Sequence, residues 1–466
     1  MPSRKIAPSP GPGLPRPTLS IETLALLSGL WIAASCNHPF WQSIMDGRDW
    51  TSPDSWPLAV GALAALTGLH ALVAGVLLTR RTARPVLAIF ILIAATASHF
   101  TESYGVYLDP GMIRNALETE PKEARDLLGF GLTLHLLIVA GPAILLIAWV
   151  RIRDRQVGPM LAHRLGFVVG TALAVAAGLL AAYPDLAGPI RSHREIRYLV
   201  TPGNVLWSMA RVAITEGREA SKPRQPIALD ARRSIPTAGA RPLLLLIMLG
   251  ETARAANWGL NGYARDTTPA LRTRGVINFP RVTACGTDTA ISVPCLFAPI
   301  GRRDYDEARI RNSESLLHVL ARTGFSVSWR DNQTGCKGVC DGLPFETIDD
   351  GSNPDCTPGR CLDIHLLDGL EAAFDGRDRV MVLHMIGSHG PAYDRRYPED
   401  HAVYQPVCGE TDLGRCSRES IVNSYDNTIR YTDTVLAAAI DRLAAHSATH
   451  DVAMLYVSDH GESLGE

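Results

Sequence analysis

Five long apolar windows in the first 185 residues constrain the fold of this 466-residue chain more than any other feature. A helix needs about 20 mainly apolar residues to cross the core of a bilayer. Soluble proteins bury single helices of this kind, but five in succession are typical of a membrane domain. We therefore predict five transmembrane helices within residues 18–185, of which the third is the shortest. The windows are 24–45, 57–79, 85–101, 127–150 and 165–184.

The placement of arginine predicts the orientation of these helices. The links after the second and fourth windows are basic, and so is the Pro-rich segment 1–17, whereas the links 46–56 and 102–126 are acidic. Because basic links stay in the cytoplasm, segment 1–17 is predicted as a cytoplasmic tail and everything after the fifth window as external. The first window lacks a small-residue cleavage site, which favours an anchor over a removable signal.

Cysteine usage is consistent with this orientation. Eight of the nine cysteines lie in the half predicted to be outside, as four close pairs. Such pairs in an oxidising compartment indicate local disulfides. Eight cysteines allow roughly a hundred connectivities, and proximity favours pairing between sequence neighbours. Zinc-binding thiolates are the alternative, but the spacings do not repeat as C-x2-C. The pairs are Cys285 and Cys295, Cys336 and Cys340, Cys356 and Cys361, and Cys408 and Cys416.

The outer half alternates strands with helices. Residues 186–240 form a linker with a short helix near 203–216, and the pattern over 241–466 predicts a parallel α/β sheet covered on both faces. The net charge of −2 provides no basic field for nucleic acid, so none is expected as a partner. The predicted strands are 242–249, 325–330, 378–387 and 451–457; the predicted helices are 313–324 with Ser313 as its cap, 362–375 and 417–446.

Polar side chains follow all four predicted strands. In open α/β sheets ligands bind beyond the carboxyl ends of the strands, which share one edge. A single polar strand end is explained equally well by a turn. Four together favour a functional site. The segments are 250–252, 330–332, 387–390 and 458–461.

These strand ends suggest metal chemistry. Glu251, Asp459 and His460 offer two carboxylates and an imidazole, a set that suits zinc with one position open. In segment 282–295 either Thr287 or Thr289 could be a nucleophile at the start of a helix, where N–H groups can hold a phosphate. Taken alone, Thr289 is better explained as a helix cap.

Three more side chains are candidates for substrate contacts. His384 and His389 could act as general acid or base or bind phosphate, although a strand histidine is more often structural, so His389 in its Gly-Pro loop is favoured. Lys337, in the "CKGVC" loop, could pair with a phosphate, although most exposed lysines are only solvated.

Several long motifs resemble the phosphoethanolamine transferases of Gram-negative bacteria, which include the lipid A enzymes linked to polymyxin resistance. In the outer half they are "GETARAANWGLNGYARDTTP", "CGTDTAISVPC", "WRDNQTGCKGVCD", "HMIGSHGPAY", "YDNTIRYTD" and "YVSDHGESLGE". In the membrane half segments 104–128 and 194–206 also match, so that the resemblance covers nearly the whole chain.

This resemblance implies five transmembrane helices in the bacterial inner membrane and a periplasmic domain of the alkaline phosphatase and sulfatase type. It further implies zinc on Glu251, Asp459 and His460, with Thr289, not Thr287, as the zinc-bound nucleophile. Gln333 stands where relatives often carry another polar residue, so it receives no role. The residues implied to contact the phosphoethanolamine, a second metal or the substrate near the membrane are Lys337, His384, His389, Asn115 and Glu123.

The implied reaction moves phosphoethanolamine from phosphatidylethanolamine onto Thr289 and then onto a lipopolysaccharide acceptor, lipid A phosphate. The product carries less negative charge, which would weaken binding of polymyxin. We expect a monomer with membrane lipids as partners. Alternatives are a membrane-anchored zinc phosphodiesterase or sulfatase-like hydrolase, and an inactive regulatory fragment. Because the family continues beyond "YVSDHGESLGE", we also expect a C-terminally truncated form with weak or no activity and exposed apolar surface at the sheet edge.

Overall fold

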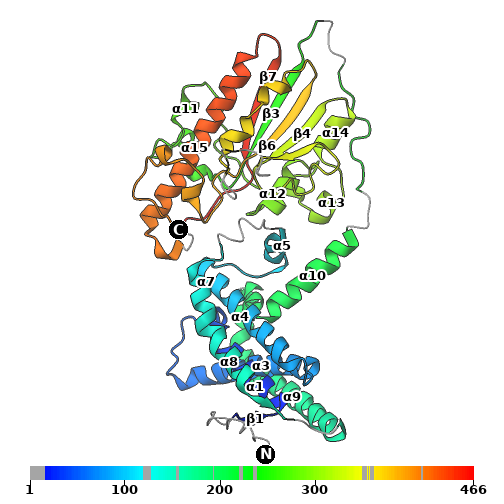
Figure 1. The fold of residues 1–466 in the computed structure, drawn as a ribbon, viewed down its shortest axis with the longest axis vertical. Helices are drawn as coiled ribbons and strands as arrows, with labels where there is room; N and C mark the ends of the chain where they lie inside the picture. The colour runs from blue at the N-terminus through cyan, green and yellow to red at the C-terminus, as the bar shows by residue number, and fades with distance from the viewer. Residues whose placement is uncertain are drawn as a thin grey trace, which may run out of the picture. The chain divides into compact units, whose positions relative to one another are not determined.

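The computed structural model divides the chain into two compact units. One comprises Met1–Ala116 with Phe130–Ile214, and the other Leu117–Gly129 with Thr215–Glu466. Figure 1 shows helices in the first unit and a sheet flanked by helices in the second. The residues that the structure describes are 16–118, 127–153, 157–192, 194–219, 224–234, 239–348, 354, 356, 361–410 and 413–465.

Among the residues described in the first unit, four helical segments are long and apolar enough to cross a membrane: Pro53–Leu77, Ala83–Tyr104, Phe130–Trp149 and Gly158–Leu186. The predicted number of five therefore holds only approximately, because the first window is divided into two shorter helices. The helices of this unit are α1 (Ile21–Ser35), α2 (His38–Ile44), α3 (Trp56–Leu77), α4 (Ala83–Tyr104), α5 (Pro110–Glu118), α7 (Phe130–His135), α8 (Gly141–Trp149), α9 (Val157–Ser192) and α10 (Gly203–Glu219).

The break between α1 and α2 lies at Asn37, followed by a proline in the first turn of α2. Asn37 is fully buried, and its amide donates to the carbonyl oxygens of Ile32 (2.9 Å) and Thr201 (3.1 Å). The N–H of Thr201 donates back to the Asn37 side-chain oxygen at 2.8 Å. The chain can leave the helical path here because a side chain replaces the lost backbone partners.

Small residues bring α3 and α9 close together. A Cβ atom added at Gly61 would lie 2.7 Å from the carbonyl oxygen of Gly178, so glycine is required for this approach. Lipid provides no hydrophobic drive between helices, and close backbone contact of this kind holds membrane helices together instead.

The second unit contains a five-stranded sheet in the order β5-β4-β6-β3-β7, with every neighbouring pair parallel. All four predicted strands are present, and β5 is an additional short edge strand. β6 ends three residues earlier than predicted because the N–H groups of Ile386 and Gly387 bond to the Asp363 carboxylate instead of a strand. The strands are β3 (Leu243–Gly250), β4 (Ser326–Asp331), β5 (Phe345–Thr347), β6 (Arg379–His384) and β7 (Asp451–Ser458).

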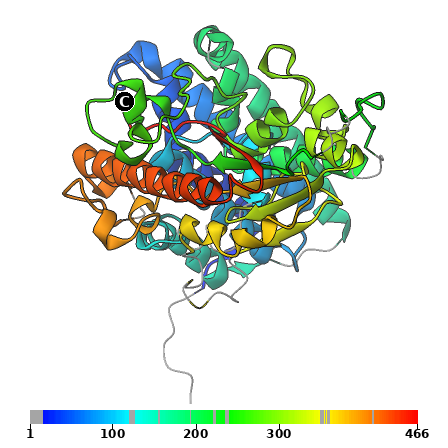
Figure 2. The ribbon, with the colours of Figure 1, turned by 90° about the horizontal axis from the view of Figure 1, so that it is seen from above.

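Helices cover both faces of this sheet, as predicted. Leu246 and Met248 of β3 belong to the core formed with α15 (Arg418–Ala445), whereas Leu249 packs in a second core with α12 (Thr289–Leu296) and α14 (Leu316–Arg322). Figures 1 and 2 show α15, in orange to red, running along one side of the strands. The remaining short helices are α11 (Pro269–Arg272) and α13 (Glu307–Arg311).

Two helix predictions are wrong in detail. α14 is capped by Ser315, not Ser313, because residue 313 forms an isolated bridge with Gln225 and is extended. The segment predicted as a helix over 362–375 forms two 3-10 turns, Asp363–Leu367 and Leu370–Ala373, separated by Gly369 at φ 66°. The long helix predicted over 417–446 is confirmed as α15.

All four predicted disulfides are present. The bonds join Cys285 to Cys295, Cys336 to Cys340, Cys356 to Cys361 and Cys408 to Cys416.

Candidate metal and nucleophile site

The register between β3 and β7 brings the predicted metal ligands together. Gly250 is opposite Ser458 in the parallel ladder, so Glu251 and Asp459 leave the sheet at the same level, and His460 follows. One ligand atom from each of these three residues lies within 4.8 Å of the others. Glu251 and Asp459 are each 1% exposed, which places both carboxylates in a region of low dielectric.

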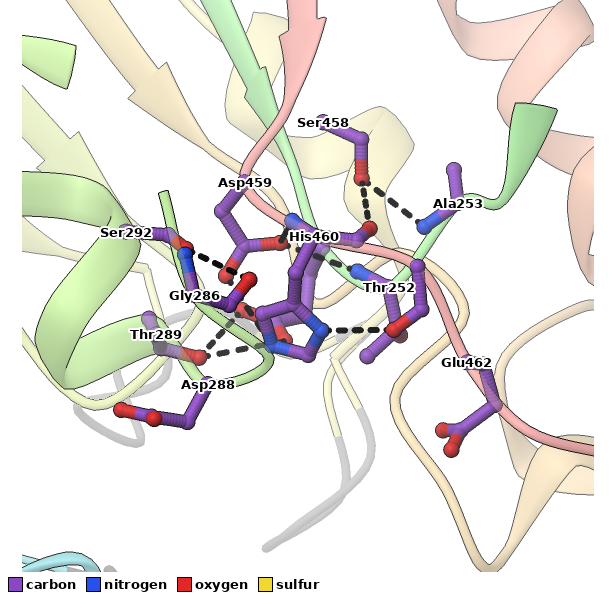
Figure 3. Close-up of polar contacts among 12 residues, drawn as sticks. Thr252, Ala253, Gly286, Asp288, Thr289, Ser292, Ser458, Asp459, His460 and Glu462 are labelled. Atoms are coloured by element: carbon purple, nitrogen blue, oxygen red, sulfur yellow. Dashed lines mark hydrogen bonds and ion pairs between the residues drawn. The ribbon is translucent and has the colours of Figure 1, made fainter. Parts of the chain in front are cut away.

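Backbone groups orient these side chains. Asp459 Oδ1 accepts the N–H groups of Thr252 (3.1 Å) and His460 (2.7 Å). His460 Nδ1 lies 2.7 Å from the Gly461 carbonyl oxygen, so Nδ1 carries a proton and Nε2 faces the carboxylates, 3.3 Å from Glu251 Oε1. Figure 3 shows this arrangement. Among the described residues, the buried Asp459 Oδ2 has no hydrogen-bond partner, and a divalent cation would satisfy it. The donor set of two carboxylates and one imidazole suits zinc.

The pKa values follow from the excess of negative charge. Burial raises the pKa of Asp459 to about 8, and the nearby Glu251 carboxylate adds to this effect. Burial also disfavours ionised Glu251, but the hydrogen bond from His460 and the neighbouring histidines outweigh it and lower that pKa to about 2. Burial opposes protonation of His460, yet the two carboxylates raise its pKa to about 10. The two carboxylates favour a positive charge beside them, which either a proton on His460 or a metal ion can supply. Binding of a metal would therefore displace that proton.

Thr289 occupies the first position of α12 and points at this group. Asp288 is the N-cap, because its side chain accepts the Ile291 N–H at 3.0 Å. Thr289 is therefore not required as a cap, and its Oγ1 lies 3.2 Å and 3.1 Å from the two carboxylate oxygens of Glu251. Thr287 is exposed. Of the two threonines that the sequence offers, Thr289 is the one that bonds to a candidate ligand.

His384 is held by Asp331, a residue for which the sequence predicted no individual role. Asp331 at the end of β4 is opposite His384 in the ladder, and its Oδ1 lies 2.9 Å from His384 Nδ1. The Trp329 indole donates to the same oxygen at 2.8 Å. Burial lowers the pKa of His384, but the Asp331 charge outweighs this and raises it. Asp331 thus fixes the ring orientation of a fully buried histidine.

The loop after β6 is fastened to Glu251. Ser388 N–H donates to the Glu251 carbonyl oxygen at 3.0 Å, and Gly387 sits at φ 52°. A Cβ at Gly387 would lie 2.7 Å from that carbonyl oxygen, so only glycine permits this approach. His389 follows and remains half-buried, and its charge contributes to lowering the Glu251 pKa. Asp363, which holds this loop from the other side, carries no sequence signal that could have identified it.

The other predicted contact residues lie on other segments of the chain. Lys337 is half-buried in the Cys336–Cys340 loop after β4, at φ 48°. Asn115 lies on α5 in the first unit. Glu123 lies outside the described residues. Their proposed roles remain predictions.

Comparisons with known proteins match both units. The family model "Phosphoethanolamine transferase EptA/EptB" matches residues 66–216, and the sulfatase model matches residues 243–466. Phosphatidylethanolamine transferase Mcr-1 of Escherichia coli is 36% identical over 465 residues, covering 97% of this chain and 86% of the relative. Phosphoethanolamine transferase EptA of Salmonella typhimurium is 35% identical over 467 residues, covering 97% and 84%.

A solved structure agrees with the whole architecture. The integral membrane protein lipooligosaccharide phosphoethanolamine transferase A of Neisseria meningitidis superposes with a TM-score of 0.88 at 31% identity, covering 97% of this chain and 84% of that one. Together with the four apolar helices, this match indicates an inner-membrane protein with its catalytic domain in the periplasm. The chain belongs to the phosphoethanolamine transferase family.

Proposed function

We propose that this enzyme transfers phosphoethanolamine from phosphatidylethanolamine to a phosphate of lipid A, through a covalent intermediate on Thr289. The single observation that carries the mechanism is the position of the Thr289 hydroxyl, 3.1 Å and 3.2 Å from the carboxylate oxygens of Glu251, which groups with Asp459 and His460. The names of the relatives support the transferred group, and that of the Neisseria meningitidis protein supports a lipooligosaccharide acceptor.

Glu251, Asp459 and His460 would hold zinc, and Thr289 would complete the set. Bound zinc would lower the pKa of the Thr289 hydroxyl and neutralise charge on the transferred phosphoryl group. The protein's own part is to position these donors. Backbone N–H groups fix Asp459, and Asp288 caps α12 so that the Thr289 hydroxyl is left for chemistry.

The reaction has two half-reactions. In the first, Thr289 Oγ1 gives up its proton and attacks the phosphorus of phosphatidylethanolamine, the new Oγ1–P bond forms, and the bond from phosphorus to the diacylglycerol oxygen breaks. That oxygen takes up a proton, and diacylglycerol leaves. In the second, a phosphate oxygen of lipid A attacks the same phosphorus, the Oγ1–P bond breaks, and Thr289 recovers its proton. Splitting one difficult transfer into two easier steps is the advantage of a covalent nucleophile.

Other residues would bind and protonate the substrate. The first N–H groups of α12, at Thr289 and Ala290, are suited to hold the phosphoryl oxygens. His389, in its loop, is suited to protonate the diacylglycerol oxygen, and Lys337 to pair with a phosphate as a point charge. We assign Asn115 and Glu123 to substrate handling near the membrane.

The covalent intermediate can be tested directly by mass spectrometry. The full-length protein is incubated in membranes with labelled phosphatidylethanolamine, and the peptide 282–301 is examined. We expect the label on this peptide in the parent protein and in the control Thr287→Ala, and its loss in Thr289→Ala. A labelled peptide in Thr289→Ala would overturn the assignment.

The acceptor and the metal require two further measurements. With lipid A present, the label should move to lipid A; release of free phosphoethanolamine at the same rate with and without lipid A would indicate a hydrolase. Asp459→Asn should lose bound zinc, measured by elemental analysis, whereas Asp266→Asn, in an exposed pair with Arg272, should retain it. Equal zinc content in the two variants would contradict the ligand set.

A further inference from the structure

The first unit contains a group of ionisable side chains that the proposed mechanism does not use. His38 begins α2, His99 and Glu102 lie near the end of α4, and His135 ends α7. We call these four residues the histidine–glutamate cluster. α4 starts at the basic link of Arg80 and Arg81, so its far end is the periplasmic end. Ionisable side chains in membrane helices are costly, and they commonly mark functional positions.

Described contacts join these residues in two pairs, His38 with Glu102 and His99 with His135. Glu102 Oε1 accepts the hydroxyl of the fully buried Ser98 at 2.7 Å, and His38 Nδ1 lies 3.9 Å from the same oxygen. The rings of His99 and His135 are 5.3 Å apart between centroids and tilted by 52°. His99 and Glu102 are three residues apart on α4 and therefore share one helix face. The bond from the buried Ser98 holds the Glu102 carboxylate against α4, while about one-third of the Glu102 side chain stays exposed.

The backbone beside His135 is unusual. Leu136–Ala140 form a π-helical turn between α7 and α8. Such turns are rare, disturb the regular hydrogen-bond ladder and often occur at functional sites. Here the Trp31 indole of α1 donates to the Val139 carbonyl oxygen at 2.9 Å, so a neighbouring helix supports the distortion. His135 Nε2 is buried and has no hydrogen-bond partner among the residues described.

The chemistry of the cluster indicates a zwitterionic ligand. Within the described part of the chain, Glu251, Asp459 and His460 are the only group whose ligand atoms could share a metal ion, so this cluster lacks that geometry. Glu102 offers a carboxylate, which suits an ammonium group. The two imidazoles offer N–H donors, which suit a phosphate oxygen. Glu102 is about one-third exposed (32% of its side chain), so a ligand can reach it.

We infer that the histidine–glutamate cluster is a separate site for the headgroup of a phosphatidylethanolamine molecule that has not yet reached Thr289, with Glu102 accepting from its ammonium group and His99 and His135 donating to its phosphate. The inference rests on the proposed function for the identity of the lipid. The lipid's acyl chains would stay in the outer leaflet beside α4 and α7. Phosphatidylglycerol shares the phosphate but lacks the amine, and phosphatidylcholine carries an ammonium group with no N–H to donate.

The test measures lipid binding by native mass spectrometry on the full-length protein. All variants carry Thr289→Ala, so that no turnover occurs. The Thr289→Ala parent should bind phosphatidylethanolamine about tenfold more tightly than phosphatidylglycerol, as one charge-assisted hydrogen bond provides. Adding Glu102→Gln should remove this selectivity, because it should weaken the binding of phosphatidylethanolamine and leave that of phosphatidylglycerol unchanged. Adding His135→Leu should weaken the binding of both lipids, because both carry the phosphate.

The matched control is His163→Gln, an exposed histidine of α9, which should leave both affinities unchanged. Equal binding of the two lipids by the Thr289→Ala parent would overturn the inference. It would also be overturned if Glu102→Gln lowered the melting temperature without changing lipid selectivity, since the cluster would then be structural. If selectivity persists but the protein with Thr289 never forms the labelled peptide 282–301, the proposed transferase mechanism fails and the headgroup site stands.

Discussion

The membrane unit and the sheet unit are stabilised by different means. In the membrane unit, large apolar side chains such as Leu180 (75% exposed) face outward, and the helices are positioned by close contact at Gly61 and by buried bonds between Asn37 and Thr201. In the sheet unit, Leu246 is fully buried in a core shared with α15. In water, burial of apolar surface drives folding; in lipid, only packing and hydrogen bonding distinguish one helix arrangement from another.

The two units also differ in what their polar groups do. Those of the sheet edge gather around Thr289, the proposed nucleophile, and those of the histidine–glutamate cluster lie near the end of α4. Thr289→Ala should reduce transfer at least about 10³-fold, as loss of a nucleophile does. Glu102→Gln should reduce transfer only about tenfold. Transfer of labelled phosphoethanolamine to lipid A measures both, with Thr289→Ser retaining the labelled peptide as control. Equal losses in the two variants would contradict this division of roles.

Leucine-to-alanine substitutions should lower the unfolding free energy much more in the sheet unit than in the membrane unit. Leu246→Ala removes a fully buried side chain and should destabilise the sheet unit by about 2–5 kcal/mol. Leu180→Ala, on the outer face of α9, should change the unfolding free energy little, because lipid contacts its side chain in both states. Thermal denaturation of the full-length protein in detergent reports both. A large effect of Leu180→Ala would show that α9 has a partner on that face.

A smaller effect is expected where the membrane helices touch. Gly61→Ala would place a methyl group 2.7 Å from the Gly178 carbonyl oxygen and should cost about 1–3 kcal/mol by forcing α3 and α9 apart. Gly170→Ala is the matched control on α9, since a Cβ there meets nothing within 4 Å. If the two variants unfold at the same temperature, close glycine packing does not hold this helix pair.

The smallest effect concerns pH and the start of β3. The Asp378 carboxylate accepts the Leu243 N–H at 2.6 Å and pairs with Arg233, and the first of these contacts lowers the pKa of Asp378 most. Since the folded pKa is depressed, the stabilisation is present above the unfolded value of 3.8 and is lost as pH falls through the folded value. Asp378→Asn should reduce stability at neutral pH by less than about 1 kcal/mol, because the group is partly solvated. Denaturant titrations at neutral and acidic pH should show a difference that shrinks with acid; a constant difference would contradict this.

Much of the fold could be predicted from the sequence, because it depends on long apolar and periodic patterns and on the spacing of cysteines. Four long apolar helices, four of the five strands, α15 and every cysteine pair followed from periodicity or proximity. The predictions that were wrong concerned segments whose structure depends on contacts with residues far away in the sequence. The bridge to Gln225 made residue 313 extended, and Asp363 drew the end of β6 away from the sheet. The division of the first apolar window depends on Asn37 bonding to Thr201, 164 residues away.

The sequence predicted which residues form the candidate site, but it did not predict the contacts that hold them in place. Strand ends identified Glu251, Asp459 and His460, and family resemblance selected Thr289 over Thr287. The structure shows why these residues can work together, through the register of β3 with β7 and the Asp288 cap. Asp331 belongs to a strand end that the sequence singled out, but its contact with His384 was not predicted; Asp363, which holds the loop after β6, looks like an ordinary turn residue in the sequence.

The pairing of β3 with β7 has a consequence for biogenesis. Glu251 follows β3 and Asp459 follows β7, 208 positions later, so the candidate metal site closes only when these two strands pair. A chain threading vectorially through the export machinery would emerge with its nucleophile already outside but without half of its ligands. Binding of a metal at this site would therefore wait until translocation has delivered β7 and the strand has paired with β3.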